Sequence, residues 1–440
     1  MRCLVSWLPA CVVVSLGLGQ GPVFEPESLI PGTSMHRCGT PTQFGTSNPA
    51  DAPDCGLNLT NPAAWAPTTV LRIPVVVHVI ANTGGTGNLS DTVVQSQITV
   101  LNEDFRALAG TPGAPGFDTK VEFFLATTDP LGAPTNGIRR YTNATWFNDT
   151  GSYWTTIAWD TTRYLNIYTN SAGGGGTLGY VPDLPQGGSV LNTTADRVVI
   201  LYSAFGRPAT GGAPYNQGRT CTHEVGHFLG LFHTFQGGCG TASCYTTGDR
   251  ICDTAAEQTA RFGCPTTAVS CGTPDPIRNY MDYTDDSCMT NFTAEQAARI
   301  RCTLANYRPN LGVPGGPLAS ATVRNGPGNY NIYTSPPPVL GTSIQLQANV
   351  TGLTYTLGSV YWYLSPDTVP FPPYTILIDL NSTLVYQTPF VAPFFGLFMF
   401  WPTSIPNDPF LAGLSVSTQA ILINGSGFGL TNAVDMTLGN

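Results

Sequence analysis

Runs of apolar, β-branched residues recur along the first half of the chain at the length of buried strands. The run from Arg72 to Ile80 is apolar almost throughout and predicts a buried strand that opens a domain. Within it, His78 is expected to be a packed strand residue and not a ligand. Shorter runs at 121–126, 164–168 and 197–202 predict three further strands. These strands would form one sheet.

Helical spacing of apolar residues appears between and after these runs. One set follows a capping Ser90 or Asp91 and comprises Val94, Ile98, Leu101 and Phe105. A second helix is predicted from about Arg219, and a third over 294–306, where Thr293 and Gln296 can form a capping box. The order strand, helix, three strands, helix predicts an α/β sheet packed by helices. Residues 173–178 would be a flexible loop or bulged edge, and an exposed edge strand near Gly179 could receive an extended peptide by main-chain pairing.

The pattern changes beyond a Gly- and Pro-rich linker at 312–317. Ile344 to Ala348 alternates, and many apolar, Thr-rich and aromatic runs follow between Gly and Pro. This predicts an all-β, sandwich-like module over 318–440. The module has no His and no Cys, so it offers no zinc ligands. We expect it to bind a surface, a glycan or another protein, or to be a stabilising or sorting appendage.

The N-terminus predicts export. Arg2 is followed by a mostly apolar stretch, Leu4 to Leu18, and by small residues, so residues 1–21 predict a signal peptide. A membrane anchor is the alternative, but the stretch is short and Pro9 interrupts it. A lipoprotein cleavage box at Leu8 to Cys11 is disfavoured because the apolar run before it is too short. Residues 22–69, rich in Pro, Thr, Asn and Gly, predict a poorly ordered segment or a pro-segment.

Composition narrows the class of protein. The chain of 440 residues is long enough for two or three domains, and 49 Gly and 37 Pro with 10% charged residues indicate a turn-rich globular protein. The net charge of -9 argues against nucleic-acid binding and fits an extracellular hydrolase. The 12 Cys favour disulfides in an oxidising compartment. A structural zinc ribbon is the alternative, but no C-x-x-C pairs appear.

The stretch from His223 to His233 carries the candidate chemistry. On a helix, His223 and His227 lie one turn apart on the same face, with Glu224 beside the first. Gly230 lets the chain leave the helix and return His233 as a third ligand. Three His and one open position are the layout of a catalytic Zn²⁺ site, in which zinc would lower the pKa of its water and Glu224 would take the proton. A buried helix with satisfied histidines is the alternative, but the extended spacing is the metzincin signature.

Two other stretches offer ligands. Cys38 lies in the N-terminal segment, where its thiolate could occupy the open zinc position; this resembles the cysteine-switch segment of latent metzincins. A disulfide between Cys38 and Cys55 is the alternative. The stretch from Gly248 to Thr254 could offer oxygen ligands to a hard cation such as Ca²⁺, or it is an ordinary Asp-rich turn.

The residues from His223 to His233, followed by Asn279 to Tyr283 and by Cys288, resemble the pappalysin family of metzincins, in particular its small secreted cytophagalysin-like members. The resemblance covers about residues 70–310 and implies a metzincin catalytic domain over 70–311, with a twisted mixed sheet, an active-site helix and a Met-turn. It further assigns site residues: His223, His227 and His233 to zinc, Glu224 as general base, Met281 to the floor beneath the metal, and Tyr283 to binding of the reacting group.

The resemblance also implies disulfides Cys239–Cys271 and Cys264–Cys288, and it places Asp249 and Thr254 near a calcium site of some relatives. It leaves the pairing of the other cysteines open, namely Cys38, Cys55, Cys221, Cys244, Cys252 and Cys302.

Together these patterns predict a secreted, latent zinc endopeptidase, a monomer that cleaves protein or peptide substrates. Asp286 follows the Met-turn in a region that in metzincins lines the pocket for the residue after the scissile bond, which predicts a preference for Arg or Lys there. A solvent-facing Asp286 is the alternative. Two other classes stay open: a zinc-bearing adhesive protein, against which an intact Glu224 argues, and a hydrolase of an ester or small amide bond.

Overall fold

The computed structural model describes residues 21–42, 55, 61–240, 243–314, 319–406, 411 and 413–439. The predicted signal peptide lies almost wholly outside these residues. The chain divides into two compact units, Met1–Gly312 and Val313–Asn440. No helix among the described residues is long and apolar enough to cross a bilayer.

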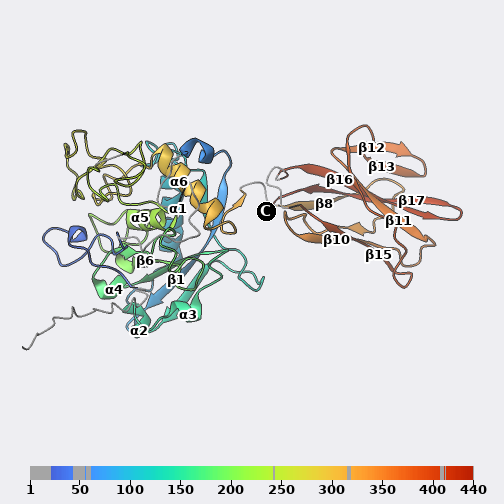
Figure 1. Ribbon diagram of the computed structural model, residues 1–440. Helices are drawn as coiled ribbons and strands as arrows, with labels where there is room; N and C mark the ends of the chain where they lie inside the picture. Colours follow the sequence, from blue (N-terminus) through green and yellow to red (C-terminus); the bar gives the residue numbers. More distant parts are fainter. Residues whose placement is uncertain are drawn as a thin grey trace, which may run out of the picture. The chain divides into compact units, whose positions relative to one another are not determined.

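The first unit is built on a mixed sheet with the strand order β2-β1-β4-β6-β5, to which β3 adds by pairing with β1. Figure 1 labels β1 and β6 of this sheet, together with the helices of the unit. The strands are β1 Leu71–Ala81, β2 Val121–Leu125, β3 Ile138–Thr142, β4 Leu165–Asn170, β5 Gly179–Tyr180 and β6 Val198–Leu201. All pairs among them are parallel except β5 with β6. Every residue of β4 and β6 is buried, as expected for central strands that are covered on both faces.

Three long helices complete this unit: α1 Asp91–Phe105, α5 Arg219–Phe228 and α6 Ala294–Asn306. The short helices are α2 Ala144–Phe147, α3 Trp154–Ile157 and α4 Ala172–Gly175, with 3-10 turns at η1 Pro26–Ser28, η2 Pro62–Trp65 and η3 Tyr202–Ala204. Ser90 caps α1 by accepting from the Val93 amide, and Thr293 and Gln296 form the predicted capping box of α6. The metzincin-like α/β arrangement predicted from the sequence is therefore present.

Some elements differ from the sequence prediction. Strand β3 was not predicted, because only Ile138 of its five residues is buried and the apolar alternation is missing. Residues 172–175, which overlap the start of the loop predicted at 173–178, form the short α4, where Gly173 and Gly174 take φ values of 62° and 73°. Glycine adopts this left-handed region without a Cβ penalty.

The described residues form four disulfides: Cys55–Cys302, Cys239–Cys271, Cys244–Cys252 and Cys264–Cys288. The second and fourth are the two pairs that the family resemblance implies. Cys55 bonds to Cys302, so the alternative Cys38–Cys55 disulfide is wrong. Among the described cysteines, Cys38 and Cys221 are free and buried.

The second unit, which begins at β7 Val313–Pro314, is all-β, as predicted. Its strands are β8 Ser320–Arg324, β9 Tyr333–Thr334, β10 Ser343–Asn349, β11 Leu357–Tyr363, β12 Pro366–Phe371, β13 Tyr374–Ile378, β14 Leu384–Gln387, β15 Phe398–Ser404, β16 Ser415–Asn424 and β17 Gly427–Thr437. They form antiparallel sheets in the orders β15-β10-β9, β14-β11-β16-β17-β8 and β12-β13. Alternate residues of β10 are buried. Leu346, Val360 and Trp401 belong to the hydrophobic core of the second unit.

Candidate metal centre

Helix α5 carries the first two histidines, and every residue of this helix is buried. A Cβ at Gly226 would lie 2.5 Å from the Met281 sulfur, so only glycine lets the Met-turn approach the helix this closely. After the helix, Gly230 has a φ of 89°, and the chain turns so that His233 faces the two helical histidines. The predicted turn thus forms where the sequence placed it.

The three imidazoles converge on one point. The Nε2 atom of His227 lies 3.0 Å from that of His223 and 2.9 Å from that of His233. His223 Nδ1 lies 2.7 Å from the Tyr280 carbonyl oxygen, and His227 Nδ1 lies 2.8 Å from that of Leu231. A carbonyl oxygen can only accept, so these Nδ1 atoms carry the protons and their Nε2 lone pairs point inward. Such lone pairs repel one another unless a cation lies between them.

The donor set fits a metal ion. Cys38 joins the three histidines, and one ligand atom from each lies within 4.8 Å of all the others. Burial is the largest cause that lowers the pKa of all three histidines, that of His227 to about 4. Neutral imidazole is the form that binds a metal, and N and S donors are those that Zn²⁺ prefers. The residues present therefore suit zinc.

Glu224 and Tyr283 lie beside this centre. Glu224 is buried; its Oε2 accepts from Thr40 Oγ1 at 2.9 Å and from the Cys38 thiol at 3.5 Å, while its Oε1 has no partner among the described residues. Burial raises the pKa of Glu224 to about 7. The Tyr283 hydroxyl lies 3.1 Å from His233 Nε2. Both predicted catalytic groups therefore reach the same point in space.

The N-terminal segment pairs with residues 176–179 at the β5 edge of the sheet. The His36 amide donates to the Gly176 carbonyl at 2.9 Å, the Leu178 amide to the His36 carbonyl at 3.0 Å, and the Gly39 amide to the Gly179 carbonyl at 2.9 Å. The edge that was expected to receive an extended peptide thus receives a segment of the chain itself. Far from being poorly ordered, residues 36–39 are fixed by main-chain bonds.

Asp286 is only 1% exposed, so a solvent-facing Asp286 is wrong. Its Oδ2 accepts from the Gln217 amide at 2.8 Å and from the Arg219 amide at 3.2 Å. The guanidinium of the fully buried Arg37 lies 3.8 Å from Oδ1. Burial raises the pKa of Asp286, and Arg37 opposes that rise. The carboxylate therefore faces a cation from the N-terminal segment.

Three other groups complete the surroundings of the Arg37 side chain. Its Nη1 donates to Thr220 Oγ1 at 3.1 Å, its Nη2 lies 3.7 Å from the Met289 sulfur, and its guanidinium lies over the Tyr215 ring at 5.0 Å. Sequence reasoning missed Arg37 and Thr40 as contacts of the site. Their positions on either side of Cys38, a predicted ligand, were the sequence signal that could have identified them.

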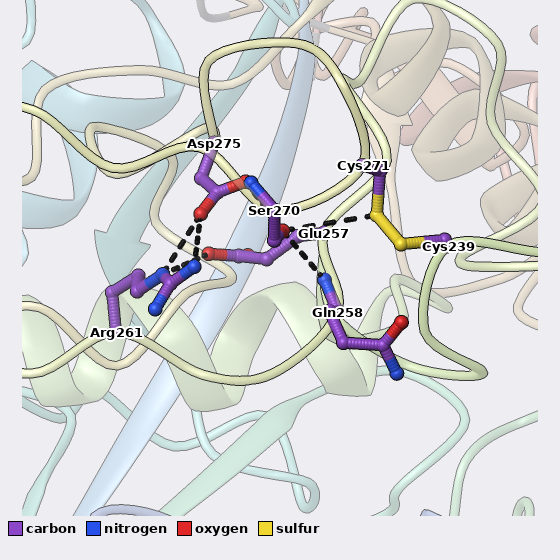
Figure 2. The surroundings of a disulfide bond; sticks show 7 residues. All are labelled: Cys239, Glu257, Gln258, Arg261, Ser270, Cys271 and Asp275. Atoms are coloured by element: carbon purple, nitrogen blue, oxygen red, sulfur yellow. Dashed lines mark hydrogen bonds and ion pairs between the residues drawn. A yellow bond between two sulfur atoms is a disulfide. The ribbon is translucent and has the colours of Figure 1, made fainter.

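A disulfide-bonded loop packs against Tyr283. Figure 2 shows the Cys239–Cys271 bond beside Ser270, whose hydroxyl donates to Asp275 at 2.6 Å, and Asp275 in turn accepts from Arg261. The loop carries Phe262, whose ring lies 5.7 Å from that of Tyr283. The loop thereby supports the ring of Tyr283.

The same loop reaches the residues next to His233 and Met281. The Arg261 amide donates to Asp282 at 3.0 Å, and Glu257 accepts from the hydroxyl of Thr234 at 2.8 Å. Sequence spacing gave no signal for these contacts, because they join residues from separate loops.

The candidate calcium residues are also brought together. Thr254 Oγ1 donates to Asp249 Oδ2 at 2.6 Å, and Asp249 Oδ1 accepts from the Ile251 amide at 3.1 Å. Burial raises the pKa of Asp249 to about 7. Both carboxylate oxygens thus have protein donors, whereas Ca²⁺ takes six to eight oxygen ligands. The described residues supply only a fragment of such a shell, and calcium stays a prediction.

Comparison with known proteins identifies a family and several relatives that this chain resembles. Residues 149–305 match the Peptidase_M43 family, described as pregnancy-associated plasma protein-A. An extracellular metalloprotease of Pyricularia oryzae is 36% identical over 247 residues, which are 54% of this chain and 77% of that protein. One from Verticillium alfalfae is 38% identical over 245 residues, with the same two coverages.

Solved structures give related matches. Promirolysin of Tannerella forsythia is 35% identical, with a TM-score of 0.49, and covers 57% of this chain and 87% of its own. Mature mirolysin of the same organism, in complex with a cleaved peptide, is 37% identical, with a TM-score of 0.46, and covers 56% and 99%. The sequence matches to the curated proteins span most of those relatives and bring their extracellular metalloprotease class to this chain. The chain belongs to the Peptidase_M43, or pappalysin, family of metzincins and is an extracellular zinc metalloendopeptidase.

Proposed function

We propose that His223, His227 and His233 hold the zinc ion of this endopeptidase and that Glu224 is its general base. The observation that supports this is the convergence of the three imidazoles: His227 Nε2 lies 3.0 Å from His223 Nε2 and 2.9 Å from His233 Nε2, and the Nδ1 protons of His223 and His227 are fixed on backbone carbonyls. A bound zinc ion supplies Lewis acidity toward the scissile carbonyl and lowers the pKa of a water. Met281, packed beneath helix α5, is the floor of the centre.

The protein groups then divide the proton transfers. The Oε1 atom of Glu224, which has no partner among the described residues, takes the proton of the attacking water and passes it to the leaving amine. The Tyr283 hydroxyl donates a hydrogen bond to the oxygen that becomes negatively charged. The substrate lies extended against residues 176–179, where its main chain pairs with the same carbonyl and amide groups that residues 36–39 use here.

In the form described, the enzyme is latent. Cys38 lies beside the three histidines, and its thiol and the Thr40 hydroxyl both donate to Glu224 Oε2. With zinc bound, Cys38 would lose this proton and hold the metal as a thiolate, which would exclude the reacting water while the N-terminal segment covers the edge strand. Removal of this segment is the activating event.

The buried Arg37 indicates what the adjoining pocket binds. Its guanidinium occupies the space between Asp286, Thr220 and the Tyr215 ring. We infer that the substrate residue after the scissile bond takes this position in the active enzyme. A buried carboxylate then favours Arg or Lys there by a charge-assisted pair.

The chain acts as a monomer on protein or peptide substrates. Its C-terminal unit binds a separate partner and does not bind the scissile peptide bond of the substrate. Two alternative classes of protein would not require the features seen here. An adhesive protein does not need a carboxylate at position 224, and an esterase does not need a sheet edge that pairs with a peptide main chain.

The test is the Glu224→Gln variant, which keeps the shape of the side chain and removes the base. We expect it to retain zinc and to lose peptide hydrolysis by several orders of magnitude. Metal content and peptidase rate are measured on the same sample, after the N-terminal segment has been removed. A folded, zinc-loaded variant with near wild-type activity would refute the assignment of the base.

A further inference from the structure

Five aromatic side chains gather on the C-terminal unit, from segments far apart in the sequence. They are Tyr330, Tyr355, Phe371, Tyr374 and Phe428, and we call them the aromatic platform. The ring of Phe428 lies 5.9 Å from that of Phe371 and 6.0 Å from that of Tyr374. The ring of Tyr330 lies 5.7 Å from that of Tyr355 and 6.1 Å from that of Tyr374. One contiguous surface results.

The platform combines exposed rings with a cluster of hydroxyl groups. Phe371 and Phe428 are 46% and 43% exposed, although each is large and apolar. The Tyr355 hydroxyl donates to that of Tyr330 at 3.3 Å and lies 3.4 Å from that of Tyr374. Exposed aromatic patches on an extracellular protein mark sites of interaction. Here the rings supply apolar faces, and the three phenols supply both donors and acceptors.

The fold is adapted to hold this cluster. A Cβ at Gly429 of β17 would lie 2.4 Å from the Tyr355 hydroxyl and 2.9 Å from the Tyr330 ring. Any other residue at 429 would therefore displace the two tyrosines. The absence of a side chain there lets both rings lie directly on the strand.

The small number of charged side chains in the C-terminal unit limits the chemical class of partner that it can bind. Residues 319–406 and 413–439 contain four charged side chains, Arg324, Asp367, Asp379 and Asp435, and no Lys. Arg324 is paired with Asp435 at 2.7 Å. Nucleic acids, sulfated glycans and anionic lipid surfaces need Lys or Arg for binding, and protein interfaces are commonly enriched in Arg. The platform contains neither Lys nor Arg, so an uncharged partner is favoured.

We propose that the aromatic platform binds a neutral polysaccharide. The C–H faces of pyranose rings stack on the exposed rings of Phe371 and Phe428, and sugar hydroxyls exchange hydrogen bonds with the phenol cluster. Such a partner satisfies the apolar rings and the hydroxyl groups together, which a purely apolar ligand cannot do. The binding would hold the protease on a polymer that contains its protein substrates, and the proposal stands independently of the catalytic assignment.

The test uses the full-length chain with Glu224→Gln, so that self-digestion does not interfere. Binding to suspensions of microcrystalline cellulose, chitin and β-1,3-glucan, and to phosphatidylcholine vesicles and immobilised gelatin, is measured by depletion for this protein and for Phe371→Ala and Phe428→Ala added singly and together. Phe395→Ala is the matched control, because Phe395 is 85% exposed but lies outside the platform. Thermal melting verifies that each variant is folded.

We expect binding to at least one polymer, competition by its soluble oligosaccharides, and a roughly tenfold to hundredfold loss of affinity in the double variant. The Phe395→Ala control should bind as the parent does. The proposal is overturned if no polymer is bound, or if the platform variants bind as tightly as the parent. It is also overturned if Phe395→Ala weakens binding equally, because that result indicates general hydrophobic adsorption. Loss of binding only to phosphatidylcholine vesicles or to immobilised gelatin in the platform variants likewise overturns it, because the partner is then a lipid or a protein.

Discussion

Cleavage of the chain on the two sides of Cys55 is predicted to have opposite effects on activity. The Cys55–Cys302 disulfide fixes Cys55 to helix α6, while Arg37 and Cys38 lie at the metal centre. A cut before Cys55 frees residues 36–39 to dissociate. A cut after Cys55 leaves them covalently attached through the disulfide.

The size of the difference follows from the contacts of the segment. Three main-chain hydrogen bonds contribute about 1 kcal/mol each, and breaking a buried ion pair such as Arg37–Asp286 costs about 3–5 kcal/mol. A net binding free energy on the order of 8 kcal/mol corresponds to a Kd of about 1 μM. A short tether gives an effective concentration on the order of 1 mM, so about one molecule in a thousand would be open. After release at about 10 nM protein, roughly 99% would be open by the same Kd.

The assay compares two full-length variants, each with a single recognition sequence for an unrelated site-specific protease, placed before or after Cys55. After cleavage, peptide hydrolysis is measured, and gels without and with reductant show whether the segment is still attached. A third protein carries the later site together with Cys302→Ser, and its cleavage should restore activity. Full activity after the later cut, with the disulfide intact, would refute the reasoning.

Two single substitutions and one truncation have predicted effects on activity. Cys38→Ala should make the uncleaved protein active at a measurable fraction of the mature rate, since the fourth position opens; a variant as inactive as the wild type contradicts the role of Cys38. Asp286→Ala should reduce kcat/KM for peptides with Arg after the scissile bond roughly tenfold or more, relative to matched peptides with Leu, in a peptide-library profile. A profile unchanged by the substitution rejects the pocket. A chain ending near Gly312 should cleave short peptides at close to the full-length rate, because the C-terminal unit has no His and no Cys; loss of short-peptide cleavage with zinc retained would show that this unit builds the cleft.

Local spacing explains why the metal-centre geometry was predictable from the sequence. His223, His227 and His233 lie within one helix and one turn, so helix geometry and a single glycine fix their relative positions. Strand β1 was equally clear, because its continuous apolar run matches a strand that is buried on both faces.

Contacts between distant segments were not predictable in this way. Cys55 and Cys302 are separated by 247 residues, and no periodicity or spacing rule relates them. Strand β3 exposes two arginines and carries one buried residue, so its pairing with β1, and not its own pattern, makes it a strand. The aromatic platform likewise depends on how hairpins meet in three dimensions.

In the mechanism we propose, Asp286 connects latency with specificity. It is buried, and its charge is compensated by two backbone amides and by Arg37. When the N-terminal segment leaves, the cation leaves with it, and a buried carboxylate without its partner is costly. A substrate with Arg or Lys at this position regains the lost compensation, whereas an apolar residue does not. Under this proposal, the same carboxylate holds the segment in place before activation and selects the substrate afterwards, so we expect a substitution that loosens one interaction to loosen the other.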